Sequence, residues 1–407
     1  MAANNTDSQE LVLVPSLRCV LVLDKVAKLA VNLLKEAGLQ VHEGEGGMGA
    51  DSLTHLINHI GADAVIVRSA TKITDTIFAN CPSLKVIARA GVGVDNIDVA
   101  AATAAGVLVI NAPEGNTLSA AEHTCSLITA LSRQLHQTFV TSIEDYASKK
   151  KSVTSGSNLI SELQGKCLAI LGLGRIGQTV GKRLHAFGMR VIGYDPLWTK
   201  ESVLPPWLDE LFVDLDKLWP EADYISLHMP LIPATRHLVN RAALSLCKPG
   251  VRIVNCARGG IIDEDALVEA LEQDKCLGAA LDVLEVEPPQ ENGTGEALIK
   301  HPRCLVTPHH GASSCEAQNR VAVEVATALC RLAGKSKGVA LNGAINLNAS
   351  GNAYLASMRR DPKLTEFLTN QVPRFAFALA TRLVLLRGIP CRAAVSRFLC
   401  VDHKFSV

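Results

Sequence analysis

Residues 167–185 read CLAILGLGRIGQTVGKRLH: an apolar run, three glycines spaced as GxGxxG, and a stretch with helical amphipathic spacing. This order predicts a strand, a tight glycine turn and a helix. A second apolar run, RVIGYD at 190–195, follows at the distance typical of a βαβ unit. The stretch therefore predicts two parallel strands joined by a crossover helix.

The same alternation of apolar and amphipathic stretches extends along most of the chain. Further strands are expected within 19–23, 62–70, 84–96, 106–113, 223–230, 251–260, 277–284 and 303–310. One long helix is expected from Ser119 to about Gln137, and the polar stretch 147–158, ASKKKSVTSGSN, predicts a loop. Such alternation is typical of α/β proteins with parallel sheets, in which ligands bind at the carboxyl ends of the strands.

Composition excludes several classes of protein. The 407 residues suggest two or three domains, and 40 Lys and Arg against 40 Asp and Glu leave no basic surplus for nucleic acid. No apolar window reaches the roughly 18 residues of a membrane span, and the polar start predicts no signal peptide, so a cytoplasmic protein is expected. The 12 cysteines are scattered without a CxxC pair. They predict reduced core residues and no metal site.

The glycine turn predicts a dinucleotide site. Gly172 permits the tight turn, Gly174 lets the backbone approach a pyrophosphate, and Gly177 lets the helix pack against the strand. Asp195, eighteen positions after Gly177, would accept hydrogen bonds from the adenosine ribose. Its charge disfavours the extra phosphate of NADP, and residues 196–198 contain no arginine, so NAD is expected. The alternative is a doubly wound fold with an incidental glycine turn.

Four other segments resemble one family. They are NTLSAAEHTCSLITALSRQ (116–134), NCARGGIIDEDAL (255–267), AALDVLEVEPP (279–289) and TPHHGAS (307–313). They are similar to the signatures of the D-isomer-specific 2-hydroxyacid dehydrogenases, and the resemblance extends from about residue 15 to about residue 345. It implies an NAD-dependent dehydrogenase that forms a homodimer or a higher homo-oligomer, with the 116–134 helix in the dimer interface.

The resemblance also implies a domain plan. Two doubly wound parallel-sheet domains are expected, a Rossmann-type NAD domain being inserted in a flavodoxin-like substrate domain. The expected bounds are 15–118 for the first part of the substrate domain, 119–308 for the NAD domain, 309–345 for the return to the substrate domain and 346–407 for a divergent tail.

The chemistry of such a family needs a base for the substrate hydroxyl, a carboxylate to orient that base, and a cation for the substrate carboxylate. By resemblance, these are His309, Glu287 and Arg258. Two adjacent histidines follow Pro308, and the first of them matches the family base. His310 takes a position that is usually apolar in the family, so it is expected to have no catalytic role.

Other roles are implied by the resemblance alone. Asp282 would bind the nicotinamide carboxamide. The remaining cofactor contacts would be Arg175, Ile176, Met229, Cys256, Ala257, Gly311 and Ala312. Gly91, Val92 and Gly93 would receive the substrate carboxylate through backbone amides.

The substrate depends on whether the cleft accepts a phosphate. VIVRSATKIT, ARAGVGVDNID and GYDP look most like the phosphoglycerate dehydrogenase branch, which oxidises 3-phospho-D-glycerate to 3-phosphooxypyruvate in serine biosynthesis. Arg68 and Arg89 end apolar strands, Lys72 follows Arg68 in the same segment, and Arg133 could reach across from a partner subunit, so these four are the phosphate candidates. Two alternatives stay open: a dehydrogenase or reductase of another small acid, such as glycerate, hydroxypyruvate or glyoxylate, and an NAD(H)-sensing protein resembling the transcriptional corepressors of this fold.

The last part of the chain departs from the family. Residues 352–407 contain nine basic and three acidic residues, and RFAFALATRLVLLRGIP is apolar but interrupted by arginine. A basic amphipathic segment that binds a partner or a membrane surface is one interpretation. An alternative or truncated end that packs poorly is the favoured one, and feedback through a regulatory domain is not expected.

Overall fold

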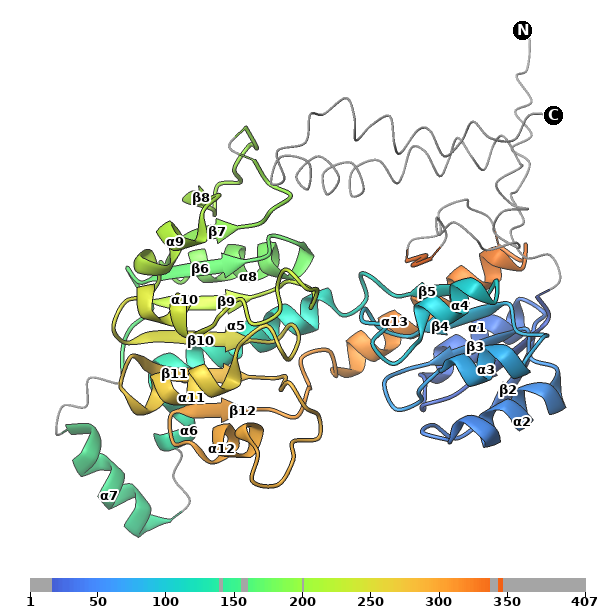
Figure 1. Ribbon diagram of the computed structural model, residues 1–407, viewed down its shortest axis with the longest axis horizontal. Coiled ribbons are helices and arrows are strands. Elements are labelled where there is room, and N and C mark those ends of the chain that lie inside the picture. Colours follow the sequence, from blue (N-terminus) through green and yellow to red (C-terminus); the bar gives the residue numbers. More distant parts are fainter. Residues whose placement is uncertain (1–16, 139–141, 155–159, 200, 337–342, 347–407) are drawn as a thin grey trace, which may run out of the picture.

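The computed structural model describes residues 17–138, 142–154, 160–199, 201–336 and 343–346. Within these ranges the chain forms two parallel sheets that are connected by two crossings of the chain (Figure 1). The α/β class expected from the alternation of apolar and amphipathic stretches is confirmed, and so are the two parallel-sheet domains that the family resemblance implies.

The smaller sheet has five strands in the order β2-β1-β3-β4-β5, which is the flavodoxin-like order. Its strands are β1 (Cys19–Val22), β2 (Gln40–Glu43), β3 (Ala64–Val67), β4 (Val86–Arg89) and β5 (Leu108–Asn111). Its helices are α1 (Lys28–Glu36), α2 (Ala50–Ile60), α3 (Asp75–Asn80), α4 (Val99–Ala104) and α13 (Cys315–Leu332). Alternate strand residues pack on α1 with α13 and on α2 with α3 and α4, so the sheet lies between two helical layers.

The larger sheet has seven strands in the order β12-β11-β10-β9-β6-β7-β8. Strands β7 and β8 lie on one side of β6, and β9 to β12 lie on the other, as in a Rossmann fold. Its strands are β6 (Cys167–Leu171), β7 (Arg190–Tyr194), β8 (Glu210–Phe212), β9 (Tyr224–Leu227), β10 (Val251–Asn255), β11 (Cys276–Leu281) and β12 (Cys304–Val306). The helices of this part are α5 (Thr117–Arg133), α6 (Leu135–Thr138), α7 (Ile143–Thr154), α8 (Arg175–His185), α9 (Leu215–Leu218), η1 (Trp219–Glu221), α10 (Arg241–Leu246), α11 (Glu264–Glu272) and α12 (Thr294–Lys300).

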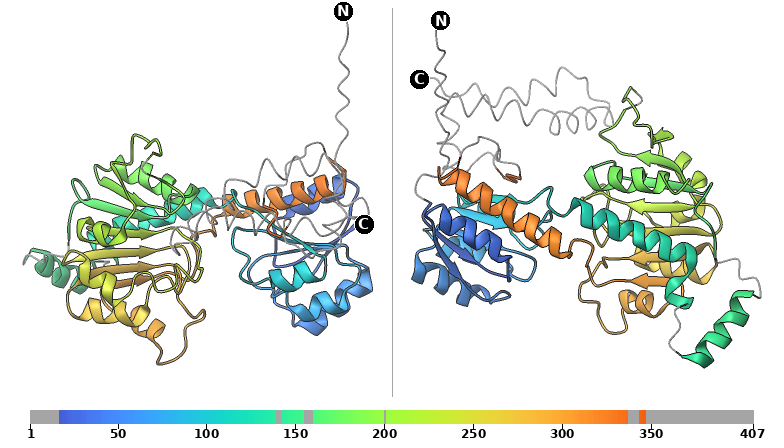
Figure 2. Two further views of the ribbon diagram at one scale, coloured as in Figure 1. Left: turned by 45° about the horizontal axis from the view of Figure 1, so that its top comes forward. Right: turned by 180° about the vertical axis from the view of Figure 1, so that it is seen from behind.

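Two helices lead from one sheet to the other. Helix α5 follows β5 of the small sheet and packs beside α8 on the large one, and α13 follows β12 and returns to pack beside α1 (Figure 2). Residues 343–346 then lie antiparallel to β5, where the amide of Asn111 donates to the carbonyl of Gly343 at 2.9 Å. The larger sheet is therefore inserted between two segments that both pack on the smaller one.

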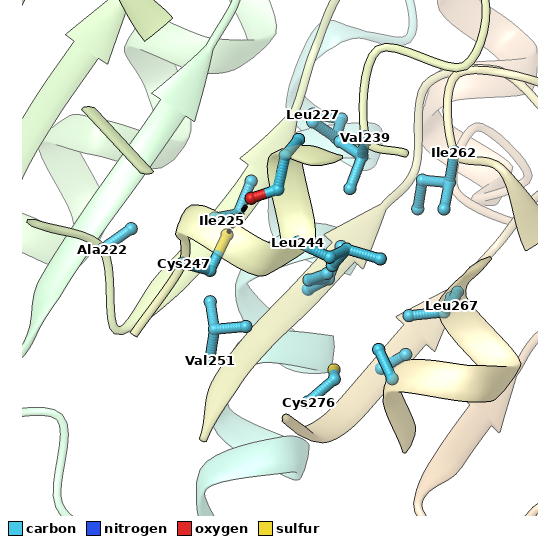
Figure 3. Packing of buried hydrophobic residues seen from close by; sticks show 14 of the residues in the cluster. Ala222, Ile225, Leu227, Val239, Leu244, Cys247, Val251, Ile262, Leu267 and Cys276 are labelled. Carbon is cyan, nitrogen blue, oxygen red and sulfur yellow. Dashed lines mark hydrogen bonds between the residues drawn. The ribbon is translucent and has the colours of Figure 1, made fainter. Parts of the chain in front are cut away.

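Continuous apolar runs explain why the central strands form. All four residues of β3, AVIV, are buried, as is typical of parallel strands that helices cover on both faces. On the larger sheet, Ile225 and Leu227 of β9 share a buried cluster with Leu244 of α10 and Leu267 of α11 (Figure 3). Burying one such side chain contributes about 1.5–3 kcal/mol, so these interior positions dominate the stability of each layer.

Some expectations from the sequence were wrong. Residues 147–158 were expected to form a loop, but 143–154 form helix α7, because lysine and alanine are good helix formers even without an apolar face. The helix expected over 119–137 begins at Thr117 and breaks at Gln134, whose φ of 52° is left-handed. Strands β2 and β8 were not expected. Both are short edge strands without buried residues, so they lack the apolar signal of the central strands.

The basic tail expected over 346–407 lies outside the described residues from position 347 onward. Within the described ranges, no helix is both long and apolar enough to cross a membrane. The cysteines in that part of the chain are free thiols, and most are buried, although Cys315 is exposed.

Candidate active site

The expected cofactor residues gather at one edge of the larger sheet, because its parallel strands all end on the same side. Gly172, Gly174, Arg175, Ile176 and Gly177 follow β6, Asp195 follows β7, Met229 follows β9, Cys256 and Ala257 follow β10, Asp282 follows β11, and Gly311 and Ala312 follow β12. This is the edge at which open parallel sheets bind ligands.

The glycine turn has the geometry of a pyrophosphate cradle. Gly172 has a φ of 100°, and a Cβ there would lie 2.5 Å from the carbonyl oxygen of His228. A Cβ on Gly177 would lie 2.0 Å from the carbonyl oxygen of Gly172, so this glycine allows α8 to approach β6. Gly174, at the N-cap of α8, has open space where its Cβ would project. The residues present therefore fit a dinucleotide whose phosphates lie on the start of α8.

Asp195 connects the end of β7 to this turn. One carboxylate oxygen accepts from the amide of Leu173 at 2.8 Å, and the other accepts from the amide of Leu197 at 2.8 Å. A carboxylate has about four acceptor positions, so both oxygens can still accept ribose hydroxyls. The contact with Leu173 was not expected from the sequence, and it gives Asp195 a structural role in the turn.

His309 and Glu287 form a direct pair. The Nδ1 atom of His309 lies 2.8 Å from Oε2 of Glu287, while the amide of Leu284 donates to Oε1 of the same carboxylate at 3.0 Å. His309 has a φ of 56°, a left-handed conformation that few residues other than glycine adopt. Its side chain is 51% exposed, so the Nε2 side of the ring can reach a bound molecule.

The pair changes the ionisation of both groups. The hydrogen bond with Glu287 raises the pKa of His309 above its ordinary value, against the opposing effect of partial burial. Burial alone would raise the pKa of Glu287, but the hydrogen bonds from His309 and Leu284 outweigh it and lower that pKa. The arrangement can hold a proton on the imidazole while the carboxylate remains charged.

Arg258 extends from the larger sheet to the smaller one. Its Nη1 donates to the carbonyl of Ala257 at 2.7 Å, and its Nε lies 3.2 Å from the carboxylate of Asp95 in the loop after β4. A Cβ on Gly93 would lie 2.0 Å from Nη2 of Arg258, so the guanidinium packs directly on that loop. The guanidinium of Arg258, in the loop after β10, therefore contacts the loop after β4.

Arg89, one of the four phosphate candidates, lies close to both Arg258 and Arg68. Arg89 ends β4 and Arg68 follows the neighbouring strand β3. Burial and the charge of Arg258 lower the pKa of Arg89 to about 10, and the charge of Arg68 acts in the same direction. The carboxylates of Asp95 and Asp24 oppose this shift without cancelling it. Asp24, which is buried, accepts from the amide of Arg68 at 2.7 Å and fixes the start of its loop.

The loop expected to receive a carboxylate is only partly free to do so. The amide of Gly91 donates to the carbonyl of Arg89 at 2.8 Å, which uses one of the three expected donors. The carbonyl of Val92 accepts from the side chain of Asn111 at 2.5 Å. A Cβ on Gly91 would lie 1.6 Å from Nη1 of Arg89, so the loop serves as a support for that guanidinium.

Arg133 is not brought to this cluster within one chain. It is the last residue of α5 and is exposed, whereas His123, nearer the start of that helix, lines a cavity together with Arg68. Among the other expected residues, Met229 is buried and Cys256 is partly buried. Burial raises the pKa of the Cys256 thiol to about 12, so this group stays protonated and uncharged beside the sheet edge.

Asp282 is almost completely buried, with 2% of its surface exposed. Its carboxylate accepts from the hydroxyl of Thr307 at 2.6 Å and from the amides of His310 and Gly311 at 2.8 and 2.7 Å. His123 of α5 also reaches it, at 3.2 Å. Sequence reasoning missed His123 and Thr307, although both lie inside the segments that carry the family resemblance. Their helical or strand-end positions alone do not show which way the side chains point.

The comparisons with known proteins agree with this geometry. Residues 125–311 match the model of the D-isomer specific 2-hydroxyacid dehydrogenase, NAD binding domain. The chain is 40% identical over 368 residues to the D-3-phosphoglycerate dehydrogenase of Methanocaldococcus jannaschii, covering 90% of this chain and 67% of that protein. The chain belongs to the D-isomer-specific 2-hydroxyacid dehydrogenase family. The cofactor of its larger domain is NAD, as predicted from the sequence.

Other known proteins and solved structures are also similar to this chain over most of its length. The D-3-phosphoglycerate dehydrogenase of Sus scrofa is 42% identical over 339 residues, which are 83% of this chain and 60% of that protein. This chain thus spans about 60% of the length of such relatives. Among solved structures, the TT0316 protein of Thermus thermophilus is 34% identical with a TM-score of 0.64, over 78% of this chain and 97% of that one. A glyoxylate reductase from Paecilomyes thermophila is 29% identical with a TM-score of 0.67, over 81% and 98%.

Proposed function

We propose that the chain catalyses the NAD-dependent oxidation of 3-phospho-D-glycerate to 3-phosphooxypyruvate, the first step of serine biosynthesis. The observation that carries the reaction class is the 2.8 Å contact between His309 and Glu287 at the edge of the NAD domain. A base and its orienting carboxylate are what the removal of a hydroxyl proton requires. Arg258, which contacts the loop after β4, supplies the cation.

In this proposal each residue handles one part of the substrate. Arg258 pairs with the C1 carboxylate and polarises the developing C2 carbonyl. His309 accepts the proton of the C2 hydroxyl through Nε2, while Glu287 stabilises the imidazolium through Nδ1. Bound NAD would accept the hydride from C2, which leaves a 2-keto acid. The protein's contribution is to orient the acid and to hold the released proton.

Arg68 and Arg89 support a phosphorylated substrate. Arg89 ends β4 and Arg68 follows the adjacent strand β3, and Arg89 interacts with both Arg258 and Arg68, so a substrate held by Arg258 could direct its other end toward them. The relatives named D-3-phosphoglycerate dehydrogenase, at 40% and 42% identity, support the same substrate. A role for Arg133 of a partner subunit in a homodimer, and a cytoplasmic location, stay predictions.

A second candidate function has one specific observation in its favour. The structural neighbour named glyoxylate reductase, at 29% identity, shares the fold over most of this chain. A small unphosphorylated acid would use Arg258, His309 and Glu287 in the same way, but it would leave Arg68 and Arg89 without a ligand. An NAD(H)-sensing protein without useful turnover is the third hypothesis from the sequence.

The test is NADH production by the full chain at mildly alkaline pH, where proton release favours oxidation. We would offer 3-phospho-D-glycerate, D-glycerate and D-lactate in parallel. Preferential oxidation of 3-phospho-D-glycerate is expected. Turnover of the unphosphorylated acids alone would contradict the proposed substrate, and NADH binding without turnover of any acid would contradict the proposed activity.

Asp195 gives a second prediction, on cofactor choice. Asp195→Asn removes the charge but keeps an acceptor for the amide of Leu173, which the carboxylate now holds at 2.8 Å. We expect the ratio of kcat/KM for NAD to that for NADP to fall roughly tenfold or more, because one charge–phosphate repulsion is removed. Asp216→Asn, at an exposed position in α9, is the control and should leave the ratio unchanged. An unchanged ratio in Asp195→Asn would remove Asp195 from cofactor selection.

A further inference from the structure

The proposed chemistry gives no role to His123, which lies in a hydrogen-bonded cluster with Thr307 and with Asp282, the residue expected to bind the nicotinamide. The Nε2 atom of His123 is 3.1 Å from the hydroxyl of Thr307 and 3.2 Å from Oδ1 of Asp282. Thr307 itself donates to Asp282 at 2.6 Å. The three side chains come from α5, from the end of β12 and from the end of β11, so segments distant in sequence meet at one point.

The donors and acceptors of this cluster can be assigned. Thr307 has one hydroxyl proton, and its 2.6 Å contact with a carboxylate uses that proton. The hydroxyl oxygen can then only accept from His123, and a carboxylate also only accepts. The Nε2 atom of His123 must therefore carry a proton and donate it toward Thr307 and Asp282.

Asp282 in turn holds the turn that carries the proposed base. Its two oxygens accept from the amides of His310 and Gly311, which directly follow His309. The amide of His309 donates back to the carbonyl of Thr307 at 2.9 Å, which closes the turn. Because His309 is left-handed, with a φ of 56°, this turn needs external support to keep its shape.

Because the cluster is buried, the carboxylate of Asp282 depends on all of these hydrogen bonds. Burial alone would raise the pKa of Asp282, but the hydrogen bonds from His123, Thr307 and the two amides outweigh it and lower that pKa. Removing one donor would leave a buried carboxylate short of a partner. The charged and titratable groups around His123 are Asp282 and, along the cavity that it lines, Arg68, Glu122 and His310.

We propose that His123 is a positioning residue for the base. Through Asp282 and Thr307 it fixes the turn at 307–311, so that His309 stays in contact with Glu287. This inference rests on the proposed dehydrogenase reaction, but the geometric coupling between His123 and His309 does not require a known substrate.

The test compares His123→Ala with His123→Gln in the full chain. A glutamine amide can place an N–H donor near the position of Nε2, whereas alanine cannot. We expect His123→Ala to lower kcat roughly 10–100-fold, as small displacements of catalytic groups do. His123→Gln should recover most of that loss. His59→Ala, which removes an exposed histidine from α2, is the matched control and should leave kcat unchanged.

A second readout separates this inference from the proposed function. The pKa of His309 is measured by imidazole NMR in the free protein, without any substrate. In His123→Ala it should move down toward its ordinary value, because the contact with Glu287 loosens, and Thr307→Val should act in the same direction. The two changes should not be additive, since they act through one carboxylate.

Each outcome of these measurements supports or overturns the positioning role. A His309 pKa and a kcat that are both unchanged in His123→Ala would overturn it. Equal losses in His123→Ala and His123→Gln, with an unchanged His309 pKa, would reduce His123 to a packing residue. If the unmodified protein oxidises no acid but its His309 pKa responds to His123→Ala, the proposed function fails and the positioning role stands.

Discussion

His309→Asn is expected to lower kcat for the oxidation of 3-phospho-D-glycerate by roughly a thousandfold, with NADH affinity nearly unchanged. A positioned general base contributes about 10²–10⁴-fold, and no other titratable side chain is hydrogen-bonded to Glu287 in the described part of the chain. Asparagine keeps a polar group at this position, and it tolerates the left-handed backbone at φ 56°. The measurement is kcat by NADH absorbance together with the Kd of NADH by fluorescence.

The pH dependence of oxidation follows from the same pair. His309 must be neutral to accept a proton, and Glu287 raises its pKa, so the rate of oxidation should fall as pH falls through that raised pKa. Glu287→Gln removes the stabilising charge and should lower the pKa of His309. The acidic limb of the profile should then move to lower pH, while kcat on the plateau falls.

His310→Asn provides the matched control, because His310 is exposed beside His309 and its backbone amide, not its ring, binds Asp282. Its kcat should stay within about threefold of the unmodified protein. Near-normal turnover in His309→Asn, or a larger loss in His310→Asn, would mean that the base is assigned to the wrong histidine.

The double change Arg68→Gln with Arg89→Gln is expected to raise KM for 3-phospho-D-glycerate by roughly 100-fold. Hydrogen bonds to charged groups contribute about 1.5–3 kcal/mol each, and about 1.4 kcal/mol corresponds to a factor of ten. Oxidation of D-glycerate, which has no phosphate, should change little. The ratio of the two kcat/KM values therefore measures phosphate recognition independently of the chemical step.

Arg241→Gln is the control for this pair of changes, since Arg241 lies on α10 in an exposed ion pair with Glu269. It should leave both substrates unaffected. Equal losses with both substrates in the double variant would mean that the two arginines only support the loop after β4. An unchanged KM for 3-phospho-D-glycerate would remove them from the substrate site.

Much of the fold was predictable because its signals are local. The apolar runs that became β1, β3, β4 and β5 are buried on both faces, so they do not depend on knowing their neighbours. The edge strands β2 and β8 were missed because only pairing with a neighbouring strand defines them. Helix α7 was missed because its sequence is polar and has no apolar face. Such a residue pattern does not distinguish a helix from a loop.

The features of the site likewise fall into those that the local sequence predicted and those that only the tertiary structure shows. Spacing alone singled out Gly172 and Gly177, and a side chain at either position would collide with the neighbouring backbone. The approach of Arg258 to Asp95 could not be predicted, because it joins loops of two different sheets. Nor could the four donors around Asp282, which come from α5 and from the turn after β12.

The sequence by itself determined the α/β class, the glycine turn and the choice of candidate side chains, because these depend on residue type and on spacing along one stretch. The tertiary structure alone decided which candidates meet: it places His309 on Glu287, brings Arg89 near both Arg258 and Arg68, and leaves Arg133 at the far end of α5. Contacts of this kind depend on how strands are ordered in a sheet, and that order is set by burial of both faces of the sheet and not by any local pattern.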